Sequence, residues 1–200
     1  MNPTNRQPLF IITGASCAGK STVCEVLFQR ENFQRENSRQ EHSRRKNTRP
    51  ENIPPDNDYI VMESDLLWHA VYDTPQDNYC AYRRLWMRVA ANISQIGKPV
   101  VLCGCAVPEQ FENQPERELF TQIHYLAVVC DDERMRKRLC RRQVADESWI
   151  ESSLSFNAWL KDNACRTEPE ITLLDTSDLT PQAAADILDR WIREKIPRRG

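Results

Sequence analysis

Glycine is scarce in this chain, which has only five glycines in 200 residues, whereas globular proteins usually contain about 7%. Two of the five, Gly14 and Gly19, stand five positions apart, and Lys20 and Ser21 follow directly. Glycine is most useful where the backbone must turn sharply or approach a ligand closely. The scarcity of glycine elsewhere therefore directs attention to residues 14–21.

Long hydrophobic runs and an excess of one charge are also missing. No apolar stretch approaches the ~20 residues of a membrane-spanning helix. The apolar run that follows the polar residues 1–8 reaches Gly14 too soon for the core of a secretory signal. The 27 basic and 29 acidic residues nearly cancel, which argues against a general nucleic-acid binder. We therefore expect a cytoplasmic protein with no membrane and no nucleic-acid partner.

The eight cysteines include no Cys-x-x-Cys pair. They stand singly inside apolar runs, as Cys103 and Cys130 do, or inside helical patterns, as Cys24 and Cys140 do. Disulfides are rare in cytosolic proteins. The cysteines are therefore predicted to be reduced thiols.

Short apolar runs alternate with helical patterns along the chain. The runs predict five buried strands, at 9–12, 59–62, 100–103, 125–130 and 171–174. Spacings of three and four predict a helix from Tyr82 to Ile96, a basic helix after the fourth strand and a helix over 147–163. A further helix is expected from Pro115 through Ile123, and Thr180-Pro181 is expected to begin the last. This alternation predicts a doubly wound α/β fold with a parallel sheet.

Residues 31–58 interrupt the pattern. They are rich in charged and amide side chains, contain few strongly apolar residues and include Pro54-Pro55. Such a segment buries too little apolar surface to offset its ordering entropy. We predict a disordered insertion in a single domain that spans residues 1–200, with Arg44-Arg45-Lys46 in a solvated loop rather than an RNA contact.

Residues 14–21 match the phosphate-loop (Walker A) pattern G-x-x-x-x-G-K-[ST], and they lie between a predicted strand and a predicted helix. In this context backbone N–H groups and a helix N-terminus bind phosphate oxygens. Lys20 is expected to reach the β- and γ-phosphates of ATP, and the Ser21 hydroxyl to hold Mg²⁺. The predicted nucleotide-binding residues are Gly14, Ala15, Ser16, Cys17, Ala18, Gly19, Lys20, Ser21 and Thr22.

Other phosphate-loop classes need features that the chain lacks. A GTPase needs Asp-x-x-Gly, but no glycine here has Asp three positions before it, and Asn-Lys-x-Asp is also missing. The Leu-Ser-Gly-Gly signature of transporter ATPases does not occur. AAA+ and RecA cores are longer and carry an acidic strand end. The one candidate, Asp131-Asp132, opens a basic helix and is predicted to be its N-cap.

The chain resembles the small P-loop kinases: nucleoside and nucleotide kinases, gluconate and shikimate kinases, and chloramphenicol phosphotransferase-like enzymes. The phosphate loop carries this resemblance. The positions of three other segments support it. These families place an acceptor-binding carboxylate where this chain has Met62-Glu63-Ser64-Asp65, and a mobile lid where it has the arginines at 138–142. They place an adenine contact where it has the loop 175–181. The resemblance implies a P-loop NTPase fold with strand order 2-3-1-4-5. One departure is that the Asp-Gly-x-Pro-Arg of nucleotide kinases is replaced by residues 103–109, Cys-Gly-Cys-Ala-Val-Pro-Glu.

Glu63 and Asp65 are two positions apart at a strand end, so both can face the same side. We predict that both bind the acceptor, with one orienting or deprotonating its hydroxyl while the other supports Mg²⁺. Alternatively, Asp65 only caps a short helix. Arg138, with Arg141 or Arg142, is expected to clamp the transferring phosphoryl group. Trp68 is a candidate to stack on a planar acceptor.

These predictions combine into an ATP-dependent small-molecule kinase. Lys20, Asp65 and Arg138 would be catalytic, with ATP and Mg²⁺ as cofactors. The acceptor would be a nucleoside, a nucleotide or a similar polyol-like metabolite. The alternative is a nucleotide-dependent binding or antibiotic-resistance-type P-loop protein that hydrolyses ATP slowly. The acceptor's identity and the oligomeric state stay open.

Overall fold

A computed structural model describes residues 6–30, 58–67, 79–141 and 146–197. Its centre is a parallel five-stranded sheet with the order β2-β3-β1-β4-β5, as predicted. The strands are β1 (Leu9–Thr13), β2 (Ile60–Glu63), β3 (Val100–Cys103), β4 (Ile123–Val129) and β5 (Ile171–Asp175). Of the predicted insertion, 31–57 lies outside the described residues, and Asp58 is paired with Arg193 at 2.5 Å.

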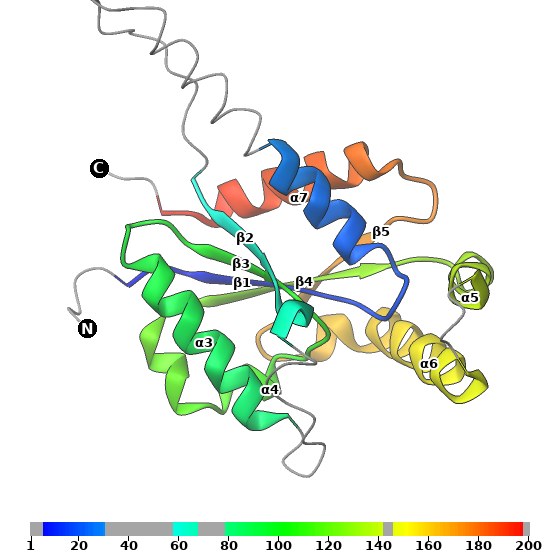
Figure 1. Ribbon diagram of the computed structural model, residues 1–200, viewed down its shortest axis with the longest axis horizontal. Coiled ribbons are helices and arrows are strands. Elements are labelled where there is room, and N and C mark those ends of the chain that lie inside the picture. The colour runs from blue at the N-terminus through cyan, green and yellow to red at the C-terminus, as the bar shows by residue number, and fades with distance from the viewer. Residues whose placement is uncertain (1–5, 31–57, 68–78, 142–145, 198–200) are drawn as a thin grey trace, which may run out of the picture.

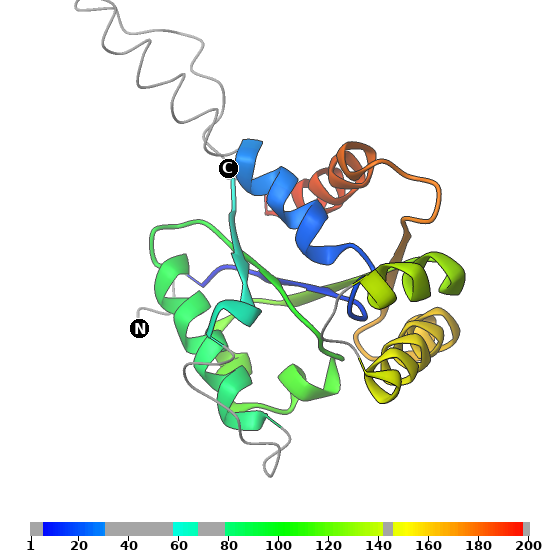
Figure 2. The same ribbon diagram turned by 45° about the vertical axis from the view of Figure 1, so that its right-hand side comes forward.

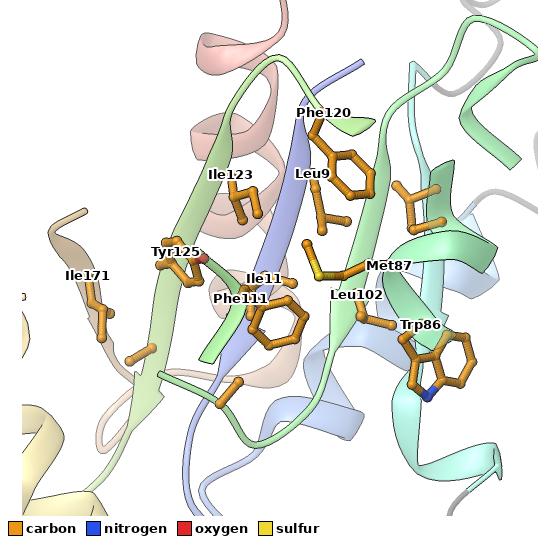
Figure 3. Close-up of a cluster of buried hydrophobic side chains, with 14 of the residues drawn as sticks. Leu9, Ile11, Trp86, Met87, Leu102, Phe111, Phe120, Ile123, Tyr125 and Ile171 are labelled. Atoms are coloured by element: carbon orange, nitrogen blue, oxygen red, sulfur yellow. The ribbon is translucent and has the colours of Figure 1, made fainter. Parts of the chain in front are cut away.

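The central strand β1 is buried on both faces. Successive side chains in a strand point to opposite faces. Leu9 and Ile11 accordingly join one core cluster, drawn in Figure 3, and Phe10 and Ile12 join another. This two-sided burial explains why the strand is a continuous apolar run rather than an alternating one.

Helices cover both faces of the sheet, and Figures 1 and 2 show the two layers. Helix α3 (Cys80–Ser94), the short α4 (Glu109–Glu112) and α6 (Glu147–Asn163) lie on one face. The helix over 20–30 and α7 (Pro181–Lys195) lie on the other. Helix α5 (Asp132–Arg141) follows the carboxyl end of β4. None of the helices described is both long and apolar enough to cross a membrane.

Two helices begin where local capping signals stand. The Asp146 side chain accepts a hydrogen bond from the Trp149 N–H at the start of α6, whose bounds match the predicted helix. Thr180 accepts from the Ala183 N–H, and Pro181 occupies the first turn of α7. Each side chain satisfies a backbone donor that would otherwise lack a partner at the helix start.

The helix predicted from Pro115 through Ile123 is wrong. The segment forms a 3-10 helix over Pro115–Leu119, called η4, after which Phe120 is extended. Ile123 is the first residue of β4, where it pairs with Leu9. The apolar spacing of Leu119, Phe120 and Ile123 therefore reflects the end of a short turn and the start of a strand, not one helical face.

One pair of cysteines departs from the expectation of reduced thiols. Cys24, on the helix over 20–30, forms a disulfide with Cys103, the last residue of β3. Both residues are buried where that helix packs on the sheet. They are 79 positions apart, so no local spacing could indicate the pairing. The disulfide joins the phosphate-loop helix to the strand that precedes Gly104.

Candidate active site

The phosphate loop connects β1 to the helix over 20–30, as predicted. Gly14 and Gly19 have φ angles of 148° and 114°, which favour glycine over residues with a side chain. A Cβ on Gly14 would lie 2.4 Å from the carbonyl oxygen of Val128 in β4. The loop therefore needs glycine at this position for backbone conformation and for close packing against the sheet.

Lys20 lies over the same loop. Its Nζ donates hydrogen bonds to the carbonyl oxygens of Gly14 at 2.7 Å and Ala15 at 2.9 Å. These contacts hold the ammonium group at the mouth of the loop, where the helix N-terminus also contributes partial positive charge. The arrangement suits an anion with several oxygens, such as a polyphosphate.

A cavity of about 450 Å³ opens beside the loop. Its lining includes the phosphate-loop residues Ser16, Cys17, Gly19, Lys20, Ser21 and Thr22. The β5–α7 connection contributes Thr176, Leu179, Thr180 and Pro181 on another side. We call this the nucleotide cavity, because it joins a phosphate site to a partly apolar wall at the carboxyl ends of the strands.

Two more elements border the nucleotide cavity. From α5, Arg138 donates a hydrogen bond to the Cys17 carbonyl at 3.2 Å, and Arg141 also lines the cavity, whereas Arg142 lies outside the described residues. From the end of β5, the buried Thr176 hydroxyl bonds to the Ala18 carbonyl at 3.2 Å. The fold thus brings the predicted lid arginine Arg138 to the phosphate loop.

Asp65 stands on a 3-10 turn, Ser64–Leu67, that directly follows β2. The Ser64 carbonyl accepts hydrogen bonds from the Tyr82 hydroxyl and, at 3.1 Å, from the Trp86 indole N–H. Both donors come from α3 and are buried. Helix α3 therefore anchors the backbone immediately before Asp65 and orients the turn.

Gly104, the residue after β3, allows this turn to approach the sheet. A Cβ at this position would lie 2.3 Å from the Ser64 Oγ and 3.3 Å from its Cβ. The Gly104 N–H also donates to the Ile12 carbonyl at 3.0 Å, which continues the sheet beyond β3. A Cβ here would therefore displace the side chain of Ser64, the residue directly before Asp65.

A second cavity of about 180 Å³ lies on the other side of Asp65. We call it the acceptor cavity, after the role that we propose for it below. Aromatic side chains dominate its walls: Tyr79, Tyr82 and Trp86 from α3 and its N-terminus, and Phe111 from α4. Ser64, Asp65, Arg83 and Cys105 supply its polar groups. Within the part of the chain that the structure describes, Asp65 alone lines both this cavity and the nucleotide cavity.

Charged groups from both cavities act on Cys105, which lines the acceptor cavity. The pKa of its thiol is raised. The main cause is that surrounding atoms shield the sulfur from water, although part of the residue is exposed. The negative charge of Asp65 raises it further. Lys20 and Arg83 act in the opposite direction. Lys20, Asp65 and Arg83 are thus close enough to influence one sulfur atom at this junction.

Glu63 is not placed with Asp65. It lines a separate hollow of about 320 Å³ together with Cys24, Phe28 and Met62. The strand ends at Glu63 and the 3-10 turn begins at Ser64, so the two-residue alternation that would put both carboxylates on one side is broken. Of the two predicted carboxylates, only Asp65 borders the nucleotide and acceptor cavities.

The oxygen donors at the junction fit Mg²⁺. Ser21 and Asp65 both line the nucleotide cavity, and Mg²⁺ prefers oxygen ligands, commonly one or two from protein with water and substrate phosphates. Across the described ranges, no three His, Cys, Asp or Glu side chains gather into a group that could hold a metal ion. Asp131 has a different role, because it accepts from the Arg134 N–H and caps α5.

Several residues of these cavities were not singled out from the sequence. The aromatic residues Tyr79 and Phe111 belong to this group, whereas Thr176 and Leu179 lie in the loop 175–181 that the resemblance placed at an adenine contact. Each stands near a strand end or a helix end, which is a weak signal because many residues share it. Trp68, the residue suggested for stacking, lies outside the described residues.

Comparison with solved structures supports the fold. A sugar kinase from Janibacter sp. superposes with a TM-score of 0.55 at 12% identity, covering 94% of this chain and 95% of that one. A gluconokinase from Sinorhizobium meliloti gives a TM-score of 0.50 at 13% identity, covering 96% and 98%. No curated protein matches the sequence.

A protein-family model described as an AAA domain matches residues 11–153. The matched range begins inside β1 and ends inside α6, so it includes the phosphate loop, Asp65 and α5. This match and the solved kinase structures agree with the resemblance to small P-loop kinases. The sheet order is also the one expected from that resemblance. The chain belongs to the AAA domain family and has a P-loop kinase-like fold.

Proposed function

We propose that this protein is an ATP-dependent kinase that phosphorylates a hydroxyl group of a small acceptor. One observation carries the proposal: Asp65 lines both the nucleotide cavity and the acceptor cavity. A carboxylate at this junction can hold a hydroxyl from one cavity against a phosphoryl group from the other. Positioning of this kind is most of what phosphoryl transfer requires from a protein.

In the proposed reaction the acceptor oxygen forms a bond to the γ-phosphorus of ATP. The bond between that phosphorus and the β,γ-bridging oxygen breaks, and ADP leaves. The hydroxyl proton passes to the Asp65 carboxylate late in the reaction.

Positive groups in the nucleotide cavity would stabilise the transferring phosphoryl group. Lys20 contributes a full charge above the loop, and Arg138 approaches from α5. Ser21 would hold Mg²⁺ from the phosphate loop. Bound Mg²⁺ would neutralise phosphate charge. The second cavity adjoining the first favours a kinase over a protein that only hydrolyses ATP slowly.

Asp65→Asn tests the proposal. The substitution keeps the shape and one acceptor oxygen but removes the base, and a positioned general base is worth roughly 10²- to 10⁴-fold in rate. We expect acceptor-dependent ADP release, measured across an acceptor library, to fall by about that factor. ATP affinity and the slow acceptor-independent hydrolysis should change little. Asp162→Asn, an exposed position on α6, is the matched control.

Two results would contradict the proposal. In one, no acceptor in the library accelerates ADP release from the native protein, which would favour the slowly hydrolysing binding protein. In the other, Asp65→Asn retains full acceptor-dependent turnover, which would reduce Asp65 to the cap of its short helix.

A further inference from the structure

We infer that the acceptor is a neutral compound built on a single aromatic ring that carries a hydroxyl on a short arm. This inference rests on the proposed function and deepens it. The ring would occupy the acceptor cavity, and the hydroxyl would reach Asp65 at the junction. The inference excludes sugar acids, free sugars and phosphorylated acceptors as the preferred class.

The walls of the acceptor cavity are the first reason. Tyr79, Tyr82 and Trp86 approach from α3 and its N-terminus, and Phe111 approaches from α4. Figure 3 shows Trp86 and Phe111 beside Ile11 and Leu102, which form part of the cavity's base. Aromatic side chains prefer offset or edge-on contacts with other rings, which add to the ordinary gain from apolar burial.

Two polar atoms of these walls are already occupied by structural contacts. The Tyr82 hydroxyl and the Trp86 indole N–H both donate to the Ser64 carbonyl. A polyol placed in the acceptor cavity would lose water without finding equivalent partners on these two walls. Burying a hydroxyl without a hydrogen-bond partner is unfavourable in proteins. A flat ring has no such requirement, so the walls favour a ring over a sugar.

The size of the cavity limits the acceptor to one ring. Its volume is about 180 Å³, and an apolar protein cavity of roughly 150 Å³ is known to bind benzene. Drug-sized ligands usually need pockets of about 300 Å³ or more. A six-membered ring with a short arm fits this space, with the arm directed towards Asp65.

The charge of the cavity argues against anionic acceptors. Among the described residues that line it, Asp65 carries negative charge and Arg83 carries positive charge, so the two balance. A phosphate monoester would bring about two further negative charges beside Asp65, which is the carboxylate that must accept a proton. Uncompensated charge in a site of low polarity is costly. A neutral acceptor avoids this cost.

The test measures binding without turnover. Isothermal titration of the protein saturated with a non-hydrolysable ATP analogue and Mg²⁺ would compare benzyl alcohol and 2-phenylethanol with gluconate, glucose and uridine monophosphate. We expect at least one of the two neutral single-ring alcohols to bind ten times more tightly than the other three compounds. The ratio between these two ligands shows which arm length fits the cavity.

Variants at Tyr79 test the aromatic wall. Tyr79→Leu removes the ring and should weaken binding of the aromatic alcohol roughly three- to tenfold. Tyr79→Phe keeps the ring and should bind as the native protein does. Both replacements meet the same left-handed backbone at this position, where φ is 57°. Trp159→Leu, on the exposed surface of α6, controls for loss of an aromatic residue elsewhere.

Two outcomes overturn the inference: gluconate, glucose or uridine monophosphate binds as tightly as the aromatic alcohols, or Tyr79→Leu weakens all ligands equally or none. These results differ from a failure of the proposed function. If aromatic alcohols bind as expected but no acceptor accelerates ADP release, the ligand preference of the cavity stands and the kinase proposal falls. If gluconate alone is phosphorylated, the kinase proposal stands and this inference falls.

Discussion

The nucleotide cavity and the acceptor cavity meet at Asp65, yet their lining residues are distributed differently along the chain. The nucleotide cavity takes much of its lining from one continuous stretch, residues 16–23, next to a helix N-terminus. The acceptor cavity takes its lining from side chains of β1, β3, α3, α4 and the loops that follow β2 and β3. The nucleotide cavity therefore relies heavily on residues that are neighbours in the chain, whereas the acceptor cavity depends on how several elements pack together.

Two connections tie these cavities to each other. Asp65 belongs to both linings, and the Cys24–Cys103 disulfide joins the phosphate-loop helix to β3, directly before Gly104. The following changes separate the two cavities or sever one of these connections, in order of expected effect.

Lys20→Ala should affect the nucleotide cavity alone. Loss of one donor to the charge of a transition state commonly costs 10²- to 10³-fold in rate. We expect ADP release to fall by about that factor, while the fold survives and acceptor affinity, measured by titration without nucleotide, is kept. Lys137→Ala on the exposed side of α5 is the control. Native turnover in Lys20→Ala would remove the phosphate loop from the mechanism.

Reducing the Cys24–Cys103 disulfide should lower the free energy of unfolding of the domain that carries both cavities. The bond closes a loop of 79 positions, and a constraint of this length stabilises a protein by about 2–4 kcal/mol. Urea unfolding with and without reductant measures the loss, which Cys24→Ser should reproduce without reductant. Cys165→Ser, at an exposed free cysteine, should have no such effect. Alkylation of all eight cysteines in the denatured, unreduced protein would show that the bond does not form.

Gly104→Ala should affect the acceptor cavity alone. The added Cβ meets the Ser64 Oγ at 2.3 Å, and overpacking of this kind costs about 1–3 kcal/mol. We expect acceptor affinity to fall about tenfold or more, while ATP affinity is unchanged. Adding Ser64→Ala removes the clashing oxygen and should restore part of the lost affinity. No recovery in the double variant would place the cause elsewhere.

Acid should weaken the ion pairs that join α3 to η4. Arg84 and Arg88 of α3 pair with the buried Glu116 of η4 at 2.8 Å and 2.9 Å. Hydrogen bonds from Arg84, with Arg88 assisting, lower the pKa of Glu116 from 4.5 to about 2. The stabilisation is therefore complete above pH 4.5 and is lost as the pH falls towards 2.

Both arginines are largely exposed, at 41% and 63%, so solvent screening limits the effect to about 1 kcal/mol. Unfolding free energies at pH 5 and pH 3 should reveal it. Glu116→Gln should lose this part of the pH dependence, whereas Glu118→Gln should keep it. An unchanged slope in Glu116→Gln would assign the acid sensitivity to other groups.

Much of the fold and one half of the site could be predicted from the sequence. The phosphate loop is contiguous, so the residues that determine its shape are neighbours in the chain. The bounds of α6 were correct because a cap at Asp146 and helical spacing act within a few residues of each other. Buried strands left continuous apolar runs because both faces of the sheet are covered.

The rest of the candidate site, around Asp65 and the acceptor cavity, was decided only by the tertiary structure. The separation of Glu63 from Asp65 follows from the 3-10 turn, which two α3 donors hold through the Ser64 carbonyl. The disulfide and the acceptor cavity likewise join residues that are distant in the chain. Local patterns record contacts within a turn or a strand, where the neighbours are known in advance. Contacts between distant segments depend on how the helices settle on the sheet, and no single segment of the sequence contains that information.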